Sequence, residues 1–276
     1  MKHIFKPLIF TALAAIFFVA CKKNNYSVDV DPLQPGAFAK FNVKATADTA
    51  GTYYIKNTGE TFNIPIGITD VSSVDRVINL CYTSNSAVQG VQYNGPTTVT
   101  IKAGETLDTL RIAGLFSGYP LSSRVDTLYL KICGGDVPTS SYWNNFRLIM
   151  RKYCDVNLTA LAGDYDNVID NGNYGPYSMT MTPVSTTGTK GVITVENLWD
   201  PGAPVTTTVN LDWTNAASFT ATIADQVYYA PANWWIKGTT AGSFSSCDQS
   251  FTLRYQLYNK TTGAILYNNQ VTVMKR

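Results

Sequence analysis

FNIPIGI, residues 62–68, places an apolar side chain at every second position. This alternation predicts a β-strand, because successive side chains of a strand point to opposite faces of a sheet. The pattern recurs in short segments along most of the chain. In the first half, the predicted strands are residues 37–43, 62–68, 74–82, 98–101, 106–113, 126–132 and 146–151. In the second half, they are residues 163–165, 177–181, 191–198, 205–213, 219–223, 251–258 and 264–273.

Turn residues separate several of these segments, for example Asn171-Gly172, Pro201-Gly202 and Thr262-Gly263. No segment of about 12 residues or more has a helical period, although residues 158–162 are compatible with a single turn. The predicted fold class is therefore all-β. We expect an immunoglobulin-like β-sandwich in residues 36–153, followed by a second antiparallel β-meander or barrel in residues 154–276.

The first 20 residues have the features of a secretory signal. Lys2 and Lys6 precede an apolar run, which ends at the small residue Ala20 and is shorter than a membrane-spanning helix of about 20 residues. FVAC, residues 18–21, resembles the lipobox of bacterial lipoproteins, which implies lipidation of Cys21. We therefore expect an exported outer-membrane lipoprotein with a flexible tether in residues 21–35, on the cell surface or on the periplasmic face.

Removal of the signal also removes His3, the single histidine of the chain. A mature protein without histidine has neither a Ser-His-Asp or Cys-His catalytic arrangement nor imidazole ligands for a metal. The 21 basic side chains, less Lys2 and Lys6, balance the 19 acidic ones. This balance argues against nucleic acid as a partner, because Lys and Arg supply most of the affinity for phosphates. No cofactor is indicated.

Four cysteines remain besides Cys21, and none of them stands in a CxxC motif. Export permits disulfides, and four cysteines allow three complete pairings. We favour Cys81–Cys133 and Cys154–Cys247, because each pair then lies within one expected domain. The alternative is that the four thiols are free and buried as small apolar side chains.

GVQY, residues 90–93, and TVTIKAGET, residues 98–106, resemble a pattern of Calx-β-like immunoglobulin-fold modules. The pattern is also similar to the amino-terminal domains of Bacteroidota lipoproteins encoded beside SusC/SusD-type glycan-uptake pairs. AGDY, residues 162–165, and GSF, residues 242–244, resemble the lipocalin-like carboxy-terminal domains of the same lipoproteins. The resemblance implies an envelope protein that assists a SusC/SusD-type transporter complex, and it supplies no catalytic residues.

The aromatic residues of the second half are the candidate ligand site. Sugar rings pack their C–H faces on aromatic rings, and YYAPANWW, residues 228–235, combines such rings with an amide. The candidate ligand-binding residues are Tyr228, Tyr229, Asn233, Trp234, Trp235 and Trp199. In a strand, Trp234 and Trp235 would face opposite sides. The competing interpretation is that these rings belong to the core, as we expect for Trp213.

A second candidate is a calcium site at Asp164, Asp166 and Asp170, because calcium prefers oxygen ligands. The spacing departs from that of an EF-hand, and the alternative is a strand end followed by an Asn-Gly turn. No pair of carboxylates stands out as a catalytic pair. We therefore expect a non-enzymatic lipoprotein that binds a glycan or another nutrient ligand. The alternatives are a protein-interaction lipoprotein without sugar binding and a carboxylate-dependent hydrolase.

Overall fold

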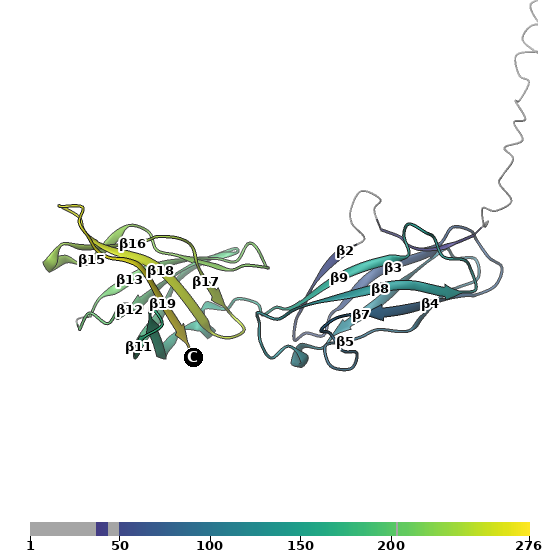
Figure 1. Ribbon diagram of the computed structural model, residues 1–276, viewed down its shortest axis with the longest axis horizontal. Helices are drawn as coiled ribbons and strands as arrows, with labels where there is room; N and C mark the ends of the chain where they lie inside the picture. The colour runs from purple at the N-terminus through teal and green to yellow at the C-terminus, as the bar shows by residue number, and fades with distance from the viewer. Residues whose placement is uncertain (1–36, 44–49, 203) are drawn as a thin grey trace, which may run out of the picture.

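The structure is a computed structural model that describes residues 37–43, 50–202 and 204–276 (Figure 1). The expected signal peptide, Cys21 and the tether lie outside these residues. Strands dominate the described part, which confirms the all-β fold class. In the same ranges, no helix is long and apolar enough to cross a membrane.

Two sheets form a sandwich in the first half of the chain. One sheet has the order β1 (Ala39–Phe41), β3 (Thr61–Ile68), β7 (Leu107–Gly114) and β5 (Tyr93–Asn94). The other has the order β2 (Ala50–Ile55), β9 (Asn145–Lys152), β8 (Val125–Gly135), β4 (Arg76–Thr83) and β6 (Thr98–Ile101). All neighbouring strands are antiparallel except β2 and β9. A short 3-10 helix, η1 (Phe116–Gly118), precedes β8.

The core of the sandwich lies between the two sheets and follows from the alternation in the sequence. Ile64 and Ile66 of β3 point inward and are fully buried, as are Leu128 and Leu148 of the facing sheet. Each such side chain contributes about 1.5–3 kcal/mol when it leaves water. Polar side chains at alternating positions, such as Asn63, Lys131 and Arg147, face the solvent, so each sheet has a buried apolar face and a solvent-exposed face.

The second half of the chain forms a third, antiparallel sheet. Its strands are β10 (Gly163–Asp170), β11 (Tyr174–Thr187), β12 (Lys190–Glu196), β13 (Thr206–Asp212), β14 (Thr220–Thr222), β15 (Gln226–Tyr229), β16 (Trp234–Gly238), β17 (Gly242–Ser245), β18 (Ser250–Asn259) and β19 (Ile265–Lys275). Strand β19 pairs with both β18 and β10, so eight of these strands close into a barrel. The remaining two, β15 and β16, extend the sheet beyond β18. Side chains such as Ile193, Val209 and Leu253 fill the barrel interior.

A short helix, α2 (Leu158–Leu161), leads into the barrel. The Asn157 side chain caps it by accepting hydrogen bonds from the Thr159 and Ala160 amides, at 3.0 and 3.3 Å. Leu158 and Leu161 are buried in the barrel core. The expected boundary near Tyr153-Cys154 therefore falls between β9 and β10, while the division into two independently folding domains stays a prediction.

The structure contains both disulfides that the sequence favoured. Cys81–Cys133 joins the neighbouring strands β4 and β8 of the sandwich. Cys154–Cys247 joins the segment after β9 to the turn between β17 and β18. The first therefore fixes a pair of strands, whereas the second fixes the connection between the sandwich and the barrel.

Candidate ligand-binding site

Four aromatic rings from different elements meet at the end of the barrel that is far from the sandwich. This distal end contains the last residues of β10, β12 and β18 and the first residues of β19. The ring centroid of Trp199, in the β12–β13 loop, lies 4.3 Å from that of Tyr267 on β19 and 6.3 Å from that of Trp234 on β16. Tyr229, which is separated from Trp234 by the short 3-10 helix η2 (Ala230–Ala232), lies 6.2 Å from it. We call Trp199, Tyr229, Trp234 and Tyr267 the aromatic cluster.

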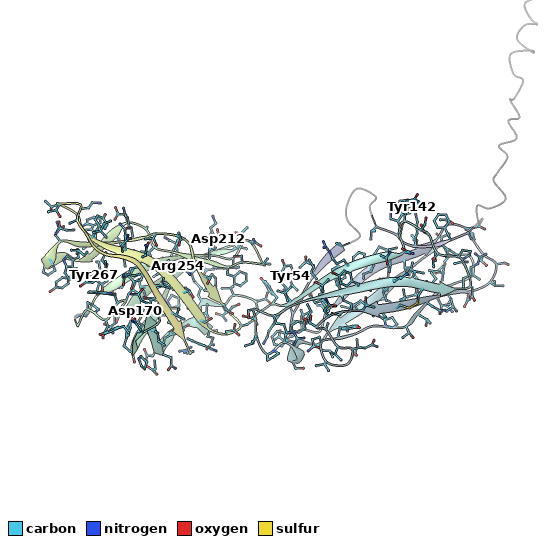
Figure 2. All side chains as sticks on the ribbon, in the orientation of Figure 1. Tyr54, Tyr142, Asp170, Asp212, Arg254 and Tyr267 are labelled. Atoms are coloured by element: carbon cyan, nitrogen blue, oxygen red, sulfur yellow. A yellow bond between two sulfur atoms is a disulfide. The ribbon has the colours of Figure 1, made fainter. Side chains whose placement is uncertain are left out.

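The cluster is accessible from outside the barrel. Tyr267 exposes 40% of its surface, and its position at the far end of the barrel is visible in Figure 2. Trp199, Tyr229 and Trp234 are half-buried and pack against the barrel core. One side of each of these rings is therefore fixed by packing, which leaves a rigid apolar surface at the distal end.

The loop that carries Trp199 has an unusual backbone. Asn197, Trp199 and Asp200 have φ values of 64°, 69° and 43°, in the left-handed region that favours glycine. For a bulky residue such as Trp199, this conformation costs about 1–3 kcal/mol and persists only where the surroundings enforce it. Backbone strain of this kind concentrates at functional sites, which directs attention to this loop.

Three hydrogen bonds hold the strained loop in place. The buried Tyr228 hydroxyl donates to the Leu198 carbonyl oxygen. The Trp199 amide donates to the Tyr177 hydroxyl at 3.2 Å, and the Asn197 side-chain amide donates to the Ser178 carbonyl oxygen at 2.9 Å. The position of the Trp199 ring is thus set from outside the loop, by Tyr177 and Ser178 of β11 and by Tyr228 of β15.

Two carboxylates lie next to the cluster. Asp170, at the end of β10, is only 2% exposed and accepts hydrogen bonds from the hydroxyls of Tyr177, at 2.9 Å, and Thr272. Burial raises the pKa of Asp170, while these two hydrogen bonds oppose the increase and the charge of Asp200 adds to it. Asp200 follows Trp199 directly and accepts a hydrogen bond from the Tyr174 hydroxyl at 2.9 Å. That bond raises the pKa of Tyr174.

The surroundings of Asp170 do not suit a general acid or base. A general acid or base needs hydrogen-bond contact with its substrate. The two oxygens of Asp170 are engaged by Thr272 and Tyr177, and its side chain is buried. The aromatic rings offer an apolar platform, and the neighbouring hydroxyl and carboxylate oxygens offer hydrogen-bonding groups to a polar ligand.

The structure divides the six ligand-site residues expected from the sequence into two groups. Trp199, Tyr229 and Trp234 belong to the aromatic cluster. The remaining three, Tyr228, Asn233 and Trp235, do not. Trp234 and Trp235 face opposite sides of β16, as strand geometry requires.

Each of the other three residues has a structural role. Tyr228, expected to contact a ligand, is only 4% exposed, and its hydroxyl donates to the Leu198 carbonyl oxygen. Asn233, with φ 54°, donates from its side-chain amide to the Thr261 hydroxyl at 2.7 Å. Trp235 lies under the Lys260 ammonium, 4.1 Å from its ring centroid, on the face opposite to Trp234.

Sequence reasoning missed Tyr267, Tyr177 and Asp200. Tyr267 reaches Trp199 only because β19 returns along β18 and closes the barrel. Asp200 had a signal in the sequence, because it lies between Trp199 and the Pro201-Gly202 turn. Binding residues are disproportionately found on loops, so a carboxylate next to a tryptophan in a predicted turn was a candidate.

Asp164, Asp166 and Asp170, the expected calcium ligands, do not form a group in the structure. Asp164 accepts from the Thr180 hydroxyl at 2.7 Å, and Asp166 accepts from the Ser178 hydroxyl at 2.9 Å, whereas Asp170 is buried. In residues 37–43, 50–202 and 204–276, no group of three or more His, Cys, Asp or Glu side chains could hold a metal ion. Regular alternation would place residues 164, 166 and 170 on one face of β10, but the register shifts between Tyr165 and Val168 and between Val168 and Asp170 turn Asp170 into the barrel.

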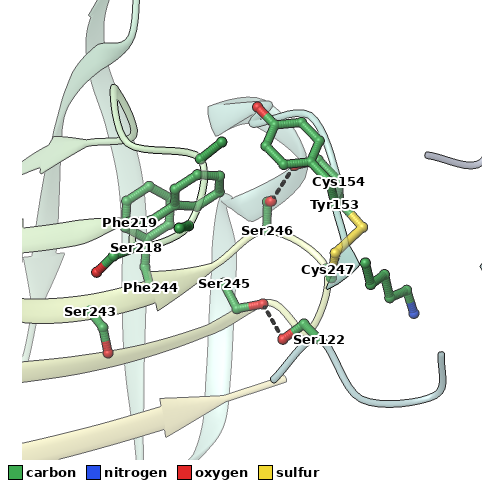
Figure 3. A pocket seen from close by; sticks show the side chains of 13 residues that line it. Ser122, Tyr153, Cys154, Ser218, Phe219, Ser243, Phe244, Ser245, Ser246 and Cys247 are labelled. Carbon is green, nitrogen blue, oxygen red and sulfur yellow. Dashed lines mark hydrogen bonds between the residues drawn. A yellow bond between two sulfur atoms is a disulfide. The ribbon is translucent and has the colours of Figure 1, made fainter. Parts of the chain in front are cut away.

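A hollow of about 260 Å³ lies at the opposite, junction end of the barrel, where it meets the sandwich (Figure 3). Phe219 and Phe244 line it, with ring centroids 5.2 Å apart, and Tyr153 of the β9–α2 segment contacts Phe219 at 5.9 Å. Serine side chains form much of the remaining lining. Here Phe219 packs on both Phe244 and Tyr153, so the segment that leaves the sandwich covers part of the aromatic surface.

A second hollow, of about 420 Å³, lies over strands β11 to β14. Its lining is mainly polar and includes Ser185, Thr187, Lys190, Asn210 and Asp212. No aromatic ring lines it. It therefore lacks the apolar platform that distinguishes the distal end.

No family model matches the chain, and no curated protein matches it. Among solved structures, it is similar to the apo-form Calx CBD1 domain, with 12% identity, TM-score 0.33 and coverage of 42% of this chain and 96% of that one. It is also similar to a putative carbohydrate binding protein from Bacteroides ovatus, with 11% identity, TM-score 0.36 and coverage of 82% and 65%. A Bacteroides ovatus protein of unknown function matches with 12% identity, TM-score 0.36 and coverage of 86% and 90%. These identities and TM-scores are too low to assign a ligand or an activity to this chain.

Proposed function

We propose that the protein is a non-enzymatic, lipid-anchored envelope protein that binds glycans at the distal end of its barrel. The observation that carries the proposal is the aromatic cluster, in which Trp199 is held at a strained backbone position against Tyr267 and Trp234. Sugar rings pack on such surfaces, and nearby oxygens bind their hydroxyls. The predicted export and lipidation of Cys21 would present this site outside the cytoplasm.

Affinity electrophoresis and isothermal titration with soluble polysaccharides test the site. We expect at least one neutral polysaccharide to bind, and Trp199→Ala or Tyr267→Ala to weaken binding at least tenfold, or about 1.4 kcal/mol. Trp235→Ala is the matched control, because this ring lies on the other face of β16 under Lys260. Binding that responds to Trp235→Ala and not to Trp199→Ala would reject the site. Binding of no polysaccharide would instead favour the protein-interaction role.

The anchor needs a separate test in a bacterial host that lipidates exported proteins. We expect the wild-type protein in the membrane fraction and the Cys21→Ser variant in the soluble fraction. Incorporation of a labelled fatty acid by the wild type, and its loss in the variant, would link the change to Cys21. Equal membrane retention of the two proteins would contradict the anchor and leave the glycan site untouched.

A further inference from the structure

The two charged side chains that are hydrogen-bonded next to the aromatic cluster are both carboxylates. Asp200 follows Trp199 directly, and its two oxygens accept from the neutral side chains of Tyr174, at 2.9 Å, and Asn197, at 3.4 Å. Asp170 is bonded to two neutral hydroxyls. In the described residues, neither carboxylate forms an ion pair, since the five ion pairs involve other aspartates. Both carboxylates therefore lack a compensating positive charge.

The sequence that forms the distal end of the barrel contains few basic residues. No Lys or Arg occurs between Lys190 and Lys237, a stretch that contains Glu196 and Asp200 and supplies three of the four cluster rings. The whole segment 154–276 has nine acidic and six basic residues. The barrel is thus acidic, although the chain after residue 20 is balanced.

Two basic residues near the cluster, Lys237 and Lys260, lie on the opposite face of the sheet. The Lys260 ammonium lies 2.9 Å from the Asp225 carboxylate and over the ring of Trp235. Lys237 lies over the Tyr258 ring, at 5.0 Å from its centroid. Trp235 and Tyr258 are register partners on neighbouring strands, so both cations belong to the face opposite to Trp234.

The field of the two carboxylates reaches the groups beneath the cluster. Burial raises the pKa of Tyr228, and the charges of Asp170 and Asp200 raise it further. A ligand on the cluster would experience the same negative field. Two negative charges a few ångströms apart repel each other substantially even near the solvent, and salt screens part of that repulsion.

We infer that the distal site selects uncharged glycans and discriminates against glycans that carry carboxylate or sulfate groups. This inference rests on the proposed glycan-binding function, to which it adds the charge class of the ligand. Asp200 is the residue through which the discrimination acts most directly, because it is partly exposed and adjacent to Trp199, whereas Asp170 is buried.

Matched polysaccharide pairs test the inference with the full mature chain. The matched pairs are dextran with carboxymethyl-dextran, and hydroxyethyl-cellulose with carboxymethyl-cellulose. Neutral β-glucan, galactomannan and xyloglucan are added to test whether the protein binds any neutral glycan. The measured quantity is the ratio of the two dissociation constants within a pair. We expect the carboxymethyl form to bind at least about tenfold more weakly than its neutral partner, with the difference shrinking as salt increases.

Asp200→Asn should reduce this ratio severalfold, because it removes the exposed charge and keeps the side-chain shape. Asp108→Asn is the control, because it removes an exposed carboxylate from the sandwich and should leave the ratio unchanged. Thermal unfolding of each variant checks that it is folded. Equal or tighter binding of the carboxymethyl forms by a protein that binds neutral glycans would overturn the inference alone. Binding of no polysaccharide would overturn the proposed function as well.

Discussion

Both ends of the barrel carry aromatic rings, but the rings are used differently. At the junction end, Phe219 packs against Tyr153 of the segment that leaves the sandwich, and Cys154–Cys247 fixes that segment to the barrel. At the distal end, Trp199 and Tyr267 pack on each other beside two uncompensated carboxylates. The difference indicates that aromatic content alone does not define a ligand site. What matters is whether residues from another part of the protein already cover the ring faces.

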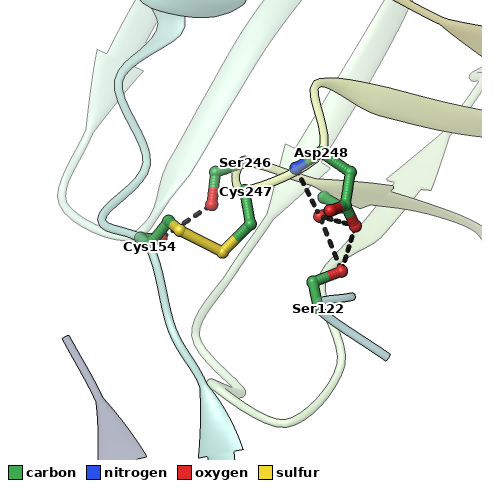
Figure 4. The surroundings of a disulfide bond; sticks show 6 residues. Ser122, Cys154, Ser246, Cys247 and Asp248 are labelled. Carbon is green, nitrogen blue, oxygen red and sulfur yellow. Dashed lines mark hydrogen bonds between the residues drawn. A yellow bond between two sulfur atoms is a disulfide. The ribbon is translucent and has the colours of Figure 1, made fainter. Parts of the chain in front are cut away.

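The junction end is also joined to the sandwich by polar contacts (Figure 4). The Ser122 hydroxyl, between β7 and β8, donates to the Asp248 carboxylate and lies 3.1 Å from the Ser245 hydroxyl. The Ser246 hydroxyl donates to the Cys154 carbonyl oxygen at 2.7 Å. The guanidinium of Arg151 donates to the Ala217 carbonyl oxygen at 3.3 Å. These bonds explain the junction end as a structural connection.

The largest expected effect is the loss of this connection. Cys154→Ser with Cys247→Ser should lower the free energy of unfolding by about 2–5 kcal/mol, since the disulfide closes a long loop. Urea unfolding measures the loss. Glycan affinity should stay the same, because the aromatic cluster lies at the other end of the barrel. A parallel loss of glycan affinity would show that the two ends of the barrel are coupled, and would contradict the separate roles given to them here.

Tyr228→Phe should have the next largest effect. It removes the hydroxyl that donates to the Leu198 carbonyl oxygen and leaves that oxygen without its partner, at a cost of about 1–3 kcal/mol. The loop that positions Trp199 should loosen, and glycan affinity should fall with stability. Unchanged affinity in a destabilised variant would mean that the strained loop does not need this support.

Asp170 should make the stability of the barrel depend on pH. Because burial raises its folded pKa above the unfolded value of about 3.9, the folded state holds the proton more tightly. Its contribution to stability is therefore complete below the unfolded pKa and is lost as pH rises through the folded pKa. Each pH unit between the two values corresponds to about 1.4 kcal/mol.

Asp170→Asn should remove this decrease in stability. Urea unfolding of the two proteins from about pH 3 to pH 7 measures the difference. The matched control is Asp166→Asn, whose carboxylate is exposed and accepts from Ser178. Parallel pH profiles for the wild type and Asp170→Asn would contradict the role of burial.

The smallest expected effect concerns the face opposite to the cluster. Lys260→Ala removes an exposed contact with Asp225 and the cation above Trp235. Exposed ion pairs contribute little to stability, so the midpoint of thermal unfolding should change less than in the three preceding cases. Glycan affinity should not change. A clear loss of affinity would assign binding to the Trp235 face instead of the Trp199 face.

The sequence predicts the fold well where one face of a strand is buried. Strand β3 alternates clearly, and its inward residues Ile64 and Ile66 are fully buried. Strand β2, Ala50–Ile55, escaped prediction because it begins with Ala50 and Gly51 and lies at a sheet edge, where few positions need an apolar side chain. Strands β15 and β16 escaped because the adjacent aromatic pairs Tyr228-Tyr229 and Trp234-Trp235 hide the period of two.

The site was predictable only in part, because it depends on contacts between distant segments. Trp199, Tyr229 and Trp234 were found from their residue types. Tyr267 reaches the cluster through the closure of the barrel by β18, β19 and β10, whereas Tyr228 is buried because β15 packs it into the barrel core. The strain at Trp199 depends on bonds from Tyr177 and Tyr228, which no local pattern indicates. Local sequence therefore supplied the candidates, and strand closure selected among them.

Hydroxyl-radical footprinting with mass spectrometry tests the central claim most directly. It compares the oxidation of individual side chains with and without a bound neutral polysaccharide. We expect protection of Trp199 and Tyr267 at the distal end. We expect no protection of Tyr153 at the junction or of Tyr142, which is 82% exposed on the sandwich. Protection at the junction or on the sandwich, with Trp199 and Tyr267 unchanged, would contradict this claim.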